Sequence, residues 1–460
     1  MTATLHRIPP DRAAVLARHG ARPTPRYTSY PTAPHFEDGF EDSAFRGWLA
    51  QLDAARPVSL YLHVPYCRQM CWYCGCNMRL AKDYGPVGEY ARWLLQELDL
   101  LGDALPGRLA VDHLHWGGGT PTALSPEDMT RAMDRVRRHF TFTEGAELAL
   151  EADPRTLTQA MIDRVGELGF TRASFGVQEF DPEVQQAIQR IQPPEMVAGA
   201  VAALRAVGVE AINFDLIYGL PHQTTGRLLD TIDRCVEMAP DRVALFGYAH
   251  VPWKATNQRM IREDALPGGA ERADQAARAA ERLLEHGYVA IGLDHFALPE
   301  DDLARAAAAG TLRRNFQGYT TDGAETLLAV GTTGIGRTPS GYYQNLPGVR
   351  AWSEAIAAGR LPVAKSRTFV DDDVLRGEVI EQIMCQGRAD CAAIGRRHDA
   401  PERWAEPCLA RLRALASEGI VAIEDQTVIL ADWAKPLARV VAAAFDRYLE
   451  EGRGRHAISV

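Results

Sequence analysis

The sequence predicts an α/β fold, in which a partial (β/α)6 barrel is followed by a smaller, mainly helical domain. Three observations lead to this prediction. Strand-like runs alternate with amphipathic stretches from residue 57 to about 250, a pattern typical of βα units. Polar or glycine-rich residues follow the strand-like runs, and after about residue 350 the chain becomes rich in Ala and Arg. At 460 residues the chain is long enough for a barrel and a second domain.

Six strand-like runs carry the barrel prediction. Amphipathic stretches such as 87–101 and 228–238 lie between them. Successive βα units make parallel strands with right-handed crossovers. A later run, 288–298, either extends this domain or lies beside it. The six runs are 59–64, 113–116, 147–152, 172–177, 212–218 and 243–249.

The chain divides into three predicted regions. Residues 1–50 form an N-terminal arm, in which 22–36 (RPTPRYTSYPTAPHF) has the composition of an extended segment lying over another part of the protein. Residues 51–350 form the barrel domain. Residues 351–460 form the C-terminal domain, which closes with a strand pair within 419–431 and a terminal helix.

Composition excludes several functional classes. Hydrophobic residues make up 46% and charged residues 24%, as in a folded soluble protein. No run of about 18 apolar residues predicts a membrane span, and the first residues do not resemble a signal peptide. We therefore expect a cytoplasmic protein. The formal net charge of −10 argues against non-specific nucleic-acid binding.

Four of the eight cysteines fall within ten residues, at 67, 71, 74 and 76. In a cytosolic chain, such clustering favours metal binding over disulfides. Three thiolates with the spacing Cx3CxxC would leave one iron of a four-iron cluster open, because such clusters usually take four cysteines. Cys76 is either a fourth ligand or a nearby thiol.

A structural zinc site is the alternative for these cysteines. Such a site normally needs a second CxxC pair. Cys385 and Cys391 have the wrong spacing and Cys235 stands alone, so the zinc alternative is disfavoured. The four scattered cysteines, which include Cys408, are expected to be small buried residues. The histidines show no metal-ligand spacing and are expected to have core or loop roles.

Active sites of parallel barrels gather where the strands end. The unusual polar and glycine residues of this chain fall at the ends of the six predicted strands. They are Cys67, Gly117–Gly119, Glu151, Gln178, Asp215 and Ala249–His250.

The motif HVPYCRQMCWYCGCN resembles the signature of the radical S-adenosylmethionine (SAM) superfamily. Together with RYTSYPT, LHWGGGTPT, FDLIYGLP and RNFQGYTT, it resembles the oxygen-independent coproporphyrinogen III oxidases (dehydrogenases) within that superfamily. The match runs from the arm to about residue 345. The resemblance implies a barrel of radical SAM type and a [4Fe–4S] cluster on Cys67, Cys71 and Cys74, with SAM chelating the open iron.

The resemblance also implies two SAM sites. The cofactor-binding residues of the first site would be Tyr61, Tyr73, Gly118, Gly119, Thr120, Glu151 and Ile335. Those of the second would be Gln178, Arg190, Asp215 and Ala249. One residue departs from the family pattern: Gln189 stands where the family typically has Asn, and this departure concerns the second site.

By resemblance, the reaction is the oxidative decarboxylation of two propionates of coproporphyrinogen III to vinyl groups, giving protoporphyrinogen IX in heme biosynthesis. The expected partners are the porphyrinogen and an electron donor such as a flavodoxin or ferredoxin. Cations are expected around the substrate, and Arg26, Arg313 and Arg314 are candidates. The arm around Tyr30 is expected to close over the barrel mouth. No catalytic acid or base is assigned.

Two alternative functions remain open at this stage. One is a related heme-binding chaperone, although that branch typically lacks the GCN continuation and the RYTSYPT arm. The other is a radical methylase or ring-opening enzyme of the same branch.

Overall fold

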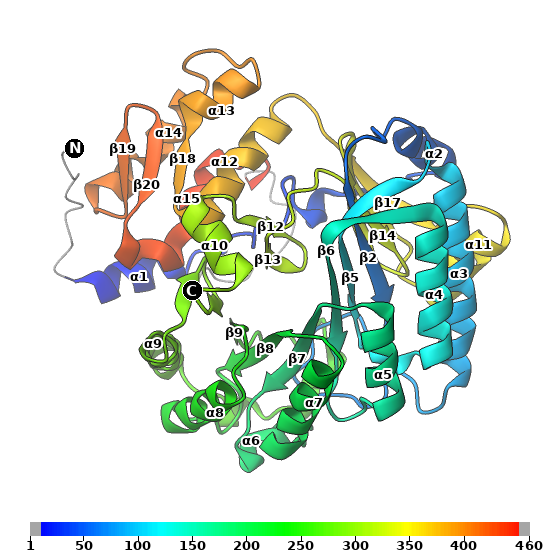
Figure 1. Ribbon diagram of the computed structural model, residues 1–460. Helices are drawn as coiled ribbons and strands as arrows, with labels where there is room; N and C mark the ends of the chain where they lie inside the picture. The colour runs from blue at the N-terminus through cyan, green and yellow to red at the C-terminus, as the bar shows by residue number, and fades with distance from the viewer. Residues whose placement is uncertain (1–10, 450–460) are drawn as a thin grey trace.

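A computed structural model describes residues 11–449 and is built around a thirteen-stranded sheet (Figure 1). Six parallel pairings join its central strands in the order β14-β2-β5-β6-β7-β8-β9. All six predicted runs are strands of this parallel part, so the predicted fold class is confirmed. The bounds are β2 (Val58–Val64), β5 (Leu109–Gly118), β6 (Phe140–Ala152), β7 (Arg172–Gln178), β8 (Ala211–Tyr218), β9 (Arg242–Gly247) and β14 (Leu327–Val330).

Antiparallel strands extend the sheet at both edges. The run 288–298 forms the hairpin β10 (Val289–Ile291) and β11 (His295–Ala297), and β11 pairs with β9. This run therefore extends the sheet. Beyond β14 lie β15 (Ile335–Thr338), β16 (Gly341–Asn345), β17 (Val363–Thr368) and β1 (Glu37–Asp38). The sheet thus continues past residue 350.

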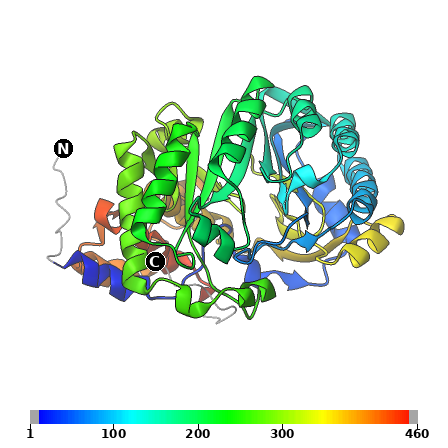
Figure 2. The same ribbon diagram turned by 90° about the horizontal axis from the view of Figure 1, so that it is seen from below.

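Helices cover the outer face of the parallel strands (Figure 2). Polar caps begin several of them: the side chains of Ser125, Thr158 and Thr224 each accept a backbone N–H of the first turn. Between helices and sheet lies an apolar core that includes Trp116, Phe175 and other fully buried residues. The helices are α2 (Asp42–Ala50), α3 (Gly85–Ala104), α4 (Pro126–His139), α5 (Gln159–Leu168), α6 (Pro182–Ala187), α7 (Pro194–Ala206), α8 (Thr225–Glu237), α9 (Gly269–Glu285) and α11 (Val349–Ala357).

The C-terminal region has an apolar core of its own, which includes Val379, Leu412 and Phe445. Its sheet has the order β18-β20-β19, and the predicted strand pair within 419–431 corresponds to β19 and β20. The four scattered cysteines are buried. The elements are α12 (Asp373–Gln386), β18 (Arg388–Asp390), α13 (Cys391–Arg397), α14 (Glu406–Ser417), β19 (Val421–Glu424), β20 (Thr427–Leu430) and α15 (Ala438–Ala442).

The N-terminal arm packs against this C-terminal region. After α1 (Arg12–Gly20), residues 22–36 are mostly irregular. The Tyr27 hydroxyl donates to Asp446 Oδ2 at 3.0 Å, and the backbone N–H of Arg447 donates to the Tyr30 hydroxyl at 3.1 Å. Arg439 Nε donates to the carbonyl of Pro25 at 3.0 Å. These contacts fix the arm along the end of the described chain.

A short hairpin lies between the main sheet and the C-terminal region (Figure 1). It comprises β12 (Arg313–Asn315) and β13 (Gly318–Thr320) and follows α10 (Asp302–Ala309). Arg313 Nη1 donates to Glu381 of α12 at 3.0 Å, which ties the hairpin to the C-terminal region. Within residues 11–449, no helix has both the length and the apolar character needed to cross a membrane.

Candidate functional site

The cysteine loop leaves the carboxyl end of β2, the first strand of the barrel. At its base the short strands β3 (Tyr66–Cys67) and β4 (Arg79–Leu80) pair in parallel. The backbone N–H of Ala81 donates to the Cys67 carbonyl at 3.0 Å, which closes the loop. Closure places the three predicted ligands on one compact turn of chain.

Two side chains that follow the last parallel strand hold the outer part of this loop. Asn257 Nδ2 lies 2.8 Å from the Cys74 carbonyl and 3.1 Å from the Cys71 carbonyl. Gln258 Nε2 donates to the Tyr73 carbonyl at 2.7 Å. Backbone carbonyls without partners in a loop cost free energy, so these two amides stabilise one conformation of the cysteine loop.

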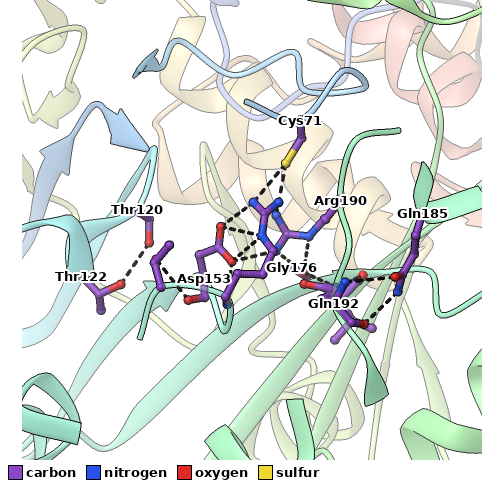
Figure 3. Close-up of polar contacts among 11 residues, drawn as sticks. Cys71, Thr120, Thr122, Asp153, Gly176, Gln185, Arg190 and Gln192 are labelled. Atoms are coloured by element: carbon purple, nitrogen blue, oxygen red, sulfur yellow. Dashed lines mark hydrogen bonds and ion pairs between the residues drawn. The ribbon is translucent and has the colours of Figure 1, made fainter. Parts of the chain in front are cut away.

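Two guanidinium groups converge on Cys71 (Figure 3). Arg190 Nη1 and Arg155 Nη2 each lie 3.3 Å from its Sγ. Asp153 holds both arginines: its carboxylate is 2.6 Å from Arg155 and 3.6 Å from Arg190. The Cys71 sulfur therefore accepts two charged N–H donors, and one carboxylate holds both arginines in place.

The neighbouring thiols have opposite pKa shifts. Burial, together with the charges of Cys74 and Cys71, raises the pKa of Cys67 to about 12. A hydrogen bond with Cys76 lowers the pKa of Cys74 to about 7. Three adjacent thiolates repel one another unless a cation lies between them, and metal binding supplies that cation.

The donor set fits a four-iron cluster better than a single ion. Among the described residues, no three His, Cys, Asp or Glu side chains are placed to share one metal ion. In a four-iron cluster each thiolate binds its own iron, so the sulfurs need not converge on one point. Cys67, Cys71 and Cys74 would hold such a cluster. Cys76 is exposed, and its backbone N–H donates to Cys74 Sγ at 3.4 Å.

The glycine run at the end of β5 lies against the base of the cysteine loop. A Cβ on Gly119 would come within 2.7 Å of the Tyr66 carbonyl oxygen, and Gly118 has a φ of +118°. Only glycine fits both positions without strain. The N–H of Thr120 donates to the Tyr66 carbonyl at 2.8 Å. The structure thus brings the predicted Gly118–Thr120 segment next to the cysteine loop.

Glu151 lies beside the same glycines. It accepts the Gly118 N–H at 3.1 Å and lies 3.4 Å from His115 Nε2. The Tyr61 ring stacks on His115 with centroids 5.9 Å apart, and its hydroxyl is 3.0 Å from His63 Nδ1. Three predicted residues, Tyr61, Gly118 and Glu151, therefore form one group, joined by two histidines that were expected to have only core or loop roles.

Asp215 connects this group to the middle of the barrel. Its carboxylate accepts from Asn213 Nδ2 at 3.0 Å and from Ser174 at 3.4 Å. Burial and the negative charge of Glu151 raise its pKa to about 6. Glu151 is thus close enough for its negative charge to act on the Asp215 carboxyl.

The predicted second-site residues Gln178 and Arg190 both lie next to Gly176. Arg190 Nε donates to the Gly176 carbonyl at 3.0 Å. A Cβ on Gly176 would lie 2.6 Å from Gln178 Nε2. The Oε1 atom of Gln178 is buried and has no hydrogen-bond partner among the described residues, so this amide has capacity left for a ligand.

Gln189 has a left-handed backbone, with a φ of +53°. Asn is several-fold enriched in this conformation, whereas most other residues are disfavoured. The backbone conformation therefore favours the Asn that the family typically has here. The departure to Gln places a residue less suited to this conformation next to Arg190.

The remaining predicted residues lie around these groups. Tyr73 packs against an apolar cluster that includes Ile188 and Tyr248. The Ala249 carbonyl accepts from Gln258 Nε2 at 3.2 Å. Ile335 begins β15, two strands away from β2 in the sheet. The candidate substrate arginines Arg313 and Arg314 lie on the β12–β13 hairpin, away from the cysteine loop.

Sequence reasoning missed four residues of this site: Asp153, Arg155, Asn257 and Gln258. Asp153 and Arg155 closely follow the third strand, so their position at a strand end was an available signal. Asn257 and Gln258 lie in a short 3-10 helix (Thr256–Met260) after the sixth strand. Their contacts with the cysteine loop span more than 180 residues, and no local pattern predicts them.

Residues 61–235 match the radical SAM superfamily. The chain is 47% identical to the oxygen-independent coproporphyrinogen III oxidase of Bradyrhizobium diazoefficiens, over 98% of this chain and 100% of the relative. It is 37% identical to the protein of the same name in Pseudomonas aeruginosa, over 92% and 93%. Coproporphyrinogen III oxidase from Escherichia coli, described as a radical SAM enzyme, has a similar structure, with a TM-score of 0.88, 35% identity and coverage of 92% and 97%.

Proposed function

The chain belongs to the oxygen-independent coproporphyrinogen III oxidases of the radical SAM superfamily, and from this premise we propose that it decarboxylates two propionates of coproporphyrinogen III to vinyl groups, giving protoporphyrinogen IX. The observation that carries this proposal is the cysteine loop at the carboxyl edge of the barrel. This loop holds the three predicted thiol ligands, and two guanidinium groups contact one of them, Cys71. The family similarity names the substrate, and the loop supplies a site for the chemistry.

When bound, the [4Fe–4S] cluster and SAM would supply the radical chemistry that removes a hydrogen atom from the β-carbon of a propionate. Carbon dioxide then leaves as the vinyl double bond forms, and one electron per propionate passes to an acceptor. The protein's own residues bind and orient the reactants. Cys67, Cys71 and Cys74 would hold the cluster, and the Asn257 and Gln258 amides keep their loop in one conformation.

The first SAM site is proposed at the carboxyl edge beside the cysteine loop. Gly118 and Gly119 let this backbone segment pack directly against His63 and Tyr66, where a side chain would clash, and so lie beside the cysteine loop. Glu151 can accept hydrogen bonds from an amino group or a ribose hydroxyl. Tyr61, Tyr73, Thr120 and Ile335 are proposed to complete this site.

A second SAM site is proposed around Gln178, Arg190, Asp215 and Ala249. The support is the open hydrogen-bonding capacity of Gln178 and the buried Arg190, whose guanidinium can pair with a carboxylate. Asp215 lies near enough to Glu151 to connect the two sites electrostatically.

Three further proposals follow from the same reading. A low-potential electron donor such as a flavodoxin or ferredoxin would reduce the cluster in the cytoplasm. The arm around Tyr30 would close over the barrel mouth and keep water from the radical. The expected division into an arm (1–50), a barrel domain (51–350) and a C-terminal domain (351–460) would need its second boundary moved beyond β17, because that strand belongs to the main sheet.

The test is anaerobic incubation of reconstituted protein with coproporphyrinogen III, SAM and a reductant, followed by mass spectrometry. The expected product has lost two carboxyl groups, and the matched control is Cys71→Ser, which should give none. Gain of a methyl group or cleavage of the macrocycle would instead indicate a methylase or ring-opening enzyme. Tight heme retention without decarboxylation would indicate a chaperone.

A further inference from the structure

A small cavity lies where the N-terminal arm, the β12–β13 hairpin and the main sheet meet. Its volume is about 50 Å³. By the same measure a water molecule needs roughly 10–15 Å³, so the cavity accommodates a group of a few non-hydrogen atoms. Its lining includes Thr28 of the arm, Arg313 and Arg314 of the hairpin, and Arg337 of β15.

The arginines around this cavity are not all in ion pairs. Arg313 is paired with Glu381 at 3.0 Å. Asp322 also lines the cavity and lies 3.6 Å from His113. Asp294 lies near enough to Arg314 for the arginine to help lower the pKa of its carboxyl, but no direct ion pair joins these two described residues.

Arg314 and Arg337 also have unused hydrogen-bond donors. Arg314 Nε and Nη1, and Arg337 Nε, are buried without a hydrogen-bond partner in the described part of the chain. Buried charged groups are normally paired, because leaving them unpaired is costly. The Arg314 guanidinium stacks over the Tyr319 ring at 4.4 Å, which fixes its plane while its edge stays free to donate.

Arg439 lies near Arg314 as well. Burial, followed by repulsion from Arg26 and Arg314, lowers the pKa of Arg439 to about 10, because a buried cation is less stable than one in water.

The cavity lies along the same face of the sheet as the proposed SAM residues. Arg337 and Ile335 are two residues apart on β15, so their side chains point to the same face. On β5, His113 and His115 are likewise two apart. His113 lies next to Asp322, which lines the cavity, whereas His115 contacts Tyr61 and Glu151. Residues two positions apart on a strand are separated by about 6.6 Å along it.

We propose that Arg314 and Arg337 bind one propionate carboxylate of the porphyrinogen in this cavity. Two guanidinium groups that line the same cavity can bind one carboxylate with several charge-assisted hydrogen bonds. The cavity holds the propionate and leaves the macrocycle on the inner face of the sheet, toward the SAM residues. Arg313 stays with Glu381 and serves to hold the hairpin in place. This inference rests on the proposed function, because that function supplies the porphyrinogen.

The experiment measures binding directly with coproporphyrin III, the air-stable oxidised form that carries the same four propionates. Cluster-loaded wild type, Arg314→Gln and Arg337→Gln are compared by equilibrium dialysis. Each variant is expected to bind about tenfold or more weakly, since a charge-assisted contact is lost. Arg314→Lys, which keeps the charge but not the planar fork, should fall between wild type and Arg314→Gln.

The control is Arg350→Gln, which removes an exposed arginine paired only with Glu354 and should bind like wild type. Cluster absorbance and 5′-deoxyadenosine formed without substrate should be unchanged in all variants. Wild-type-like binding by both Gln variants would overturn the inference, and so would loss of the cluster together with binding. If wild type itself neither bound coproporphyrin III nor converted coproporphyrinogen III, that result would contradict the proposed function, on which this inference rests.

Discussion

Arg190 Nη1 lies 3.3 Å from Cys71 Sγ, although 119 residues separate the two in sequence. The same guanidinium binds the Gly176 carbonyl through Nε, so its position is set by the end of β7. A residue proposed for the second SAM site thereby contacts a proposed cluster ligand. The two sites are physically joined, and variants at one are expected to affect the other in measurable ways.

Arg155→Gln should lower the reduction potential of the cluster. Arg155 Nη2 donates to Cys71 Sγ at 3.3 Å, and hydrogen bonds and positive charge at cluster sulfurs favour the reduced, more negative state. A redox titration followed by electron paramagnetic resonance measures the shift. Arg164→Gln, which removes an exposed pair with Glu167, is the matched control. An unchanged potential in Arg155→Gln would mean that this donor does not reach the sulfur when the cluster is bound.

Cys67→Ser, Cys71→Ser and Cys74→Ser should each abolish the cluster, whereas Cys76→Ser should keep it and lose activity. All four residues share one loop, but Cys76 is exposed and lies beyond the third ligand. Iron analysis and electron paramagnetic resonance of anaerobically reconstituted protein test the difference. A Cys76→Ser protein without iron would make Cys76 a fourth ligand and refute the three-ligand assignment.

Gln189→Asn should stabilise the protein slightly. The residue has a φ of +53°, a conformation in which Asn is less strained than Gln. We expect a gain of about 0.5 kcal/mol and a rise in Tm of about 0.5 °C, measured by thermal unfolding of the apo protein. Gln189→Ala, which has no preference for this conformation, should give no gain. Equal Tm values for the Asn and Ala variants would show that backbone strain does not explain the family's Asn.

The six parallel strands could be predicted because each is an apolar run long enough to show a pattern. The strand β14 was missed, since Leu327–Val330 is only four residues long and is followed by a glycine-rich turn. Its neighbour β15 is equally short. Short strands at the edge of a parallel core carry too little periodicity to be told from loops.

The candidate site, like the fold, has a part that the sequence predicted and a part that it did not. The cysteines and glycines are local motifs. The cysteine spacing alone indicated a metal cluster, whereas the glycine run gained its expected SAM role only from the family resemblance. The Asn257 amide and the Arg155 guanidinium reach Cys71 from residues 186 and 84 positions away. These contacts depend on the tertiary fold. A resemblance transfers only motif residues, so it could not supply them either.

Binding of SAM at the proposed second site should depend on pH because of the Asp215 carboxyl. Its pKa is raised to about 6 by burial and by Glu151, so the carboxylate is fully ionised only above that pH. An ionised Asp215 can pair with the cationic SAM, whereas the protonated form cannot. Vinyl product should therefore decline as the pH falls through about 6, under conditions in which the cluster signal is constant. Asp215→Asn should remove this dependence and stay low throughout.

Asp215→Asn and Glu151→Ala should separate the two proposed SAM sites. Asp215→Asn should keep the cluster signal and 5′-deoxyadenosine formation but lose vinyl product, because losing a charged partner costs about 1.5–3 kcal/mol in binding. Glu151→Ala should instead weaken 5′-deoxyadenosine formation itself, since Glu151 lies against Gly118 beside the cysteine loop. Both products are quantified side by side for each variant. Near-normal vinyl product from Asp215→Asn would rule out a required second SAM at this carboxylate and leave Glu151 serving a single site.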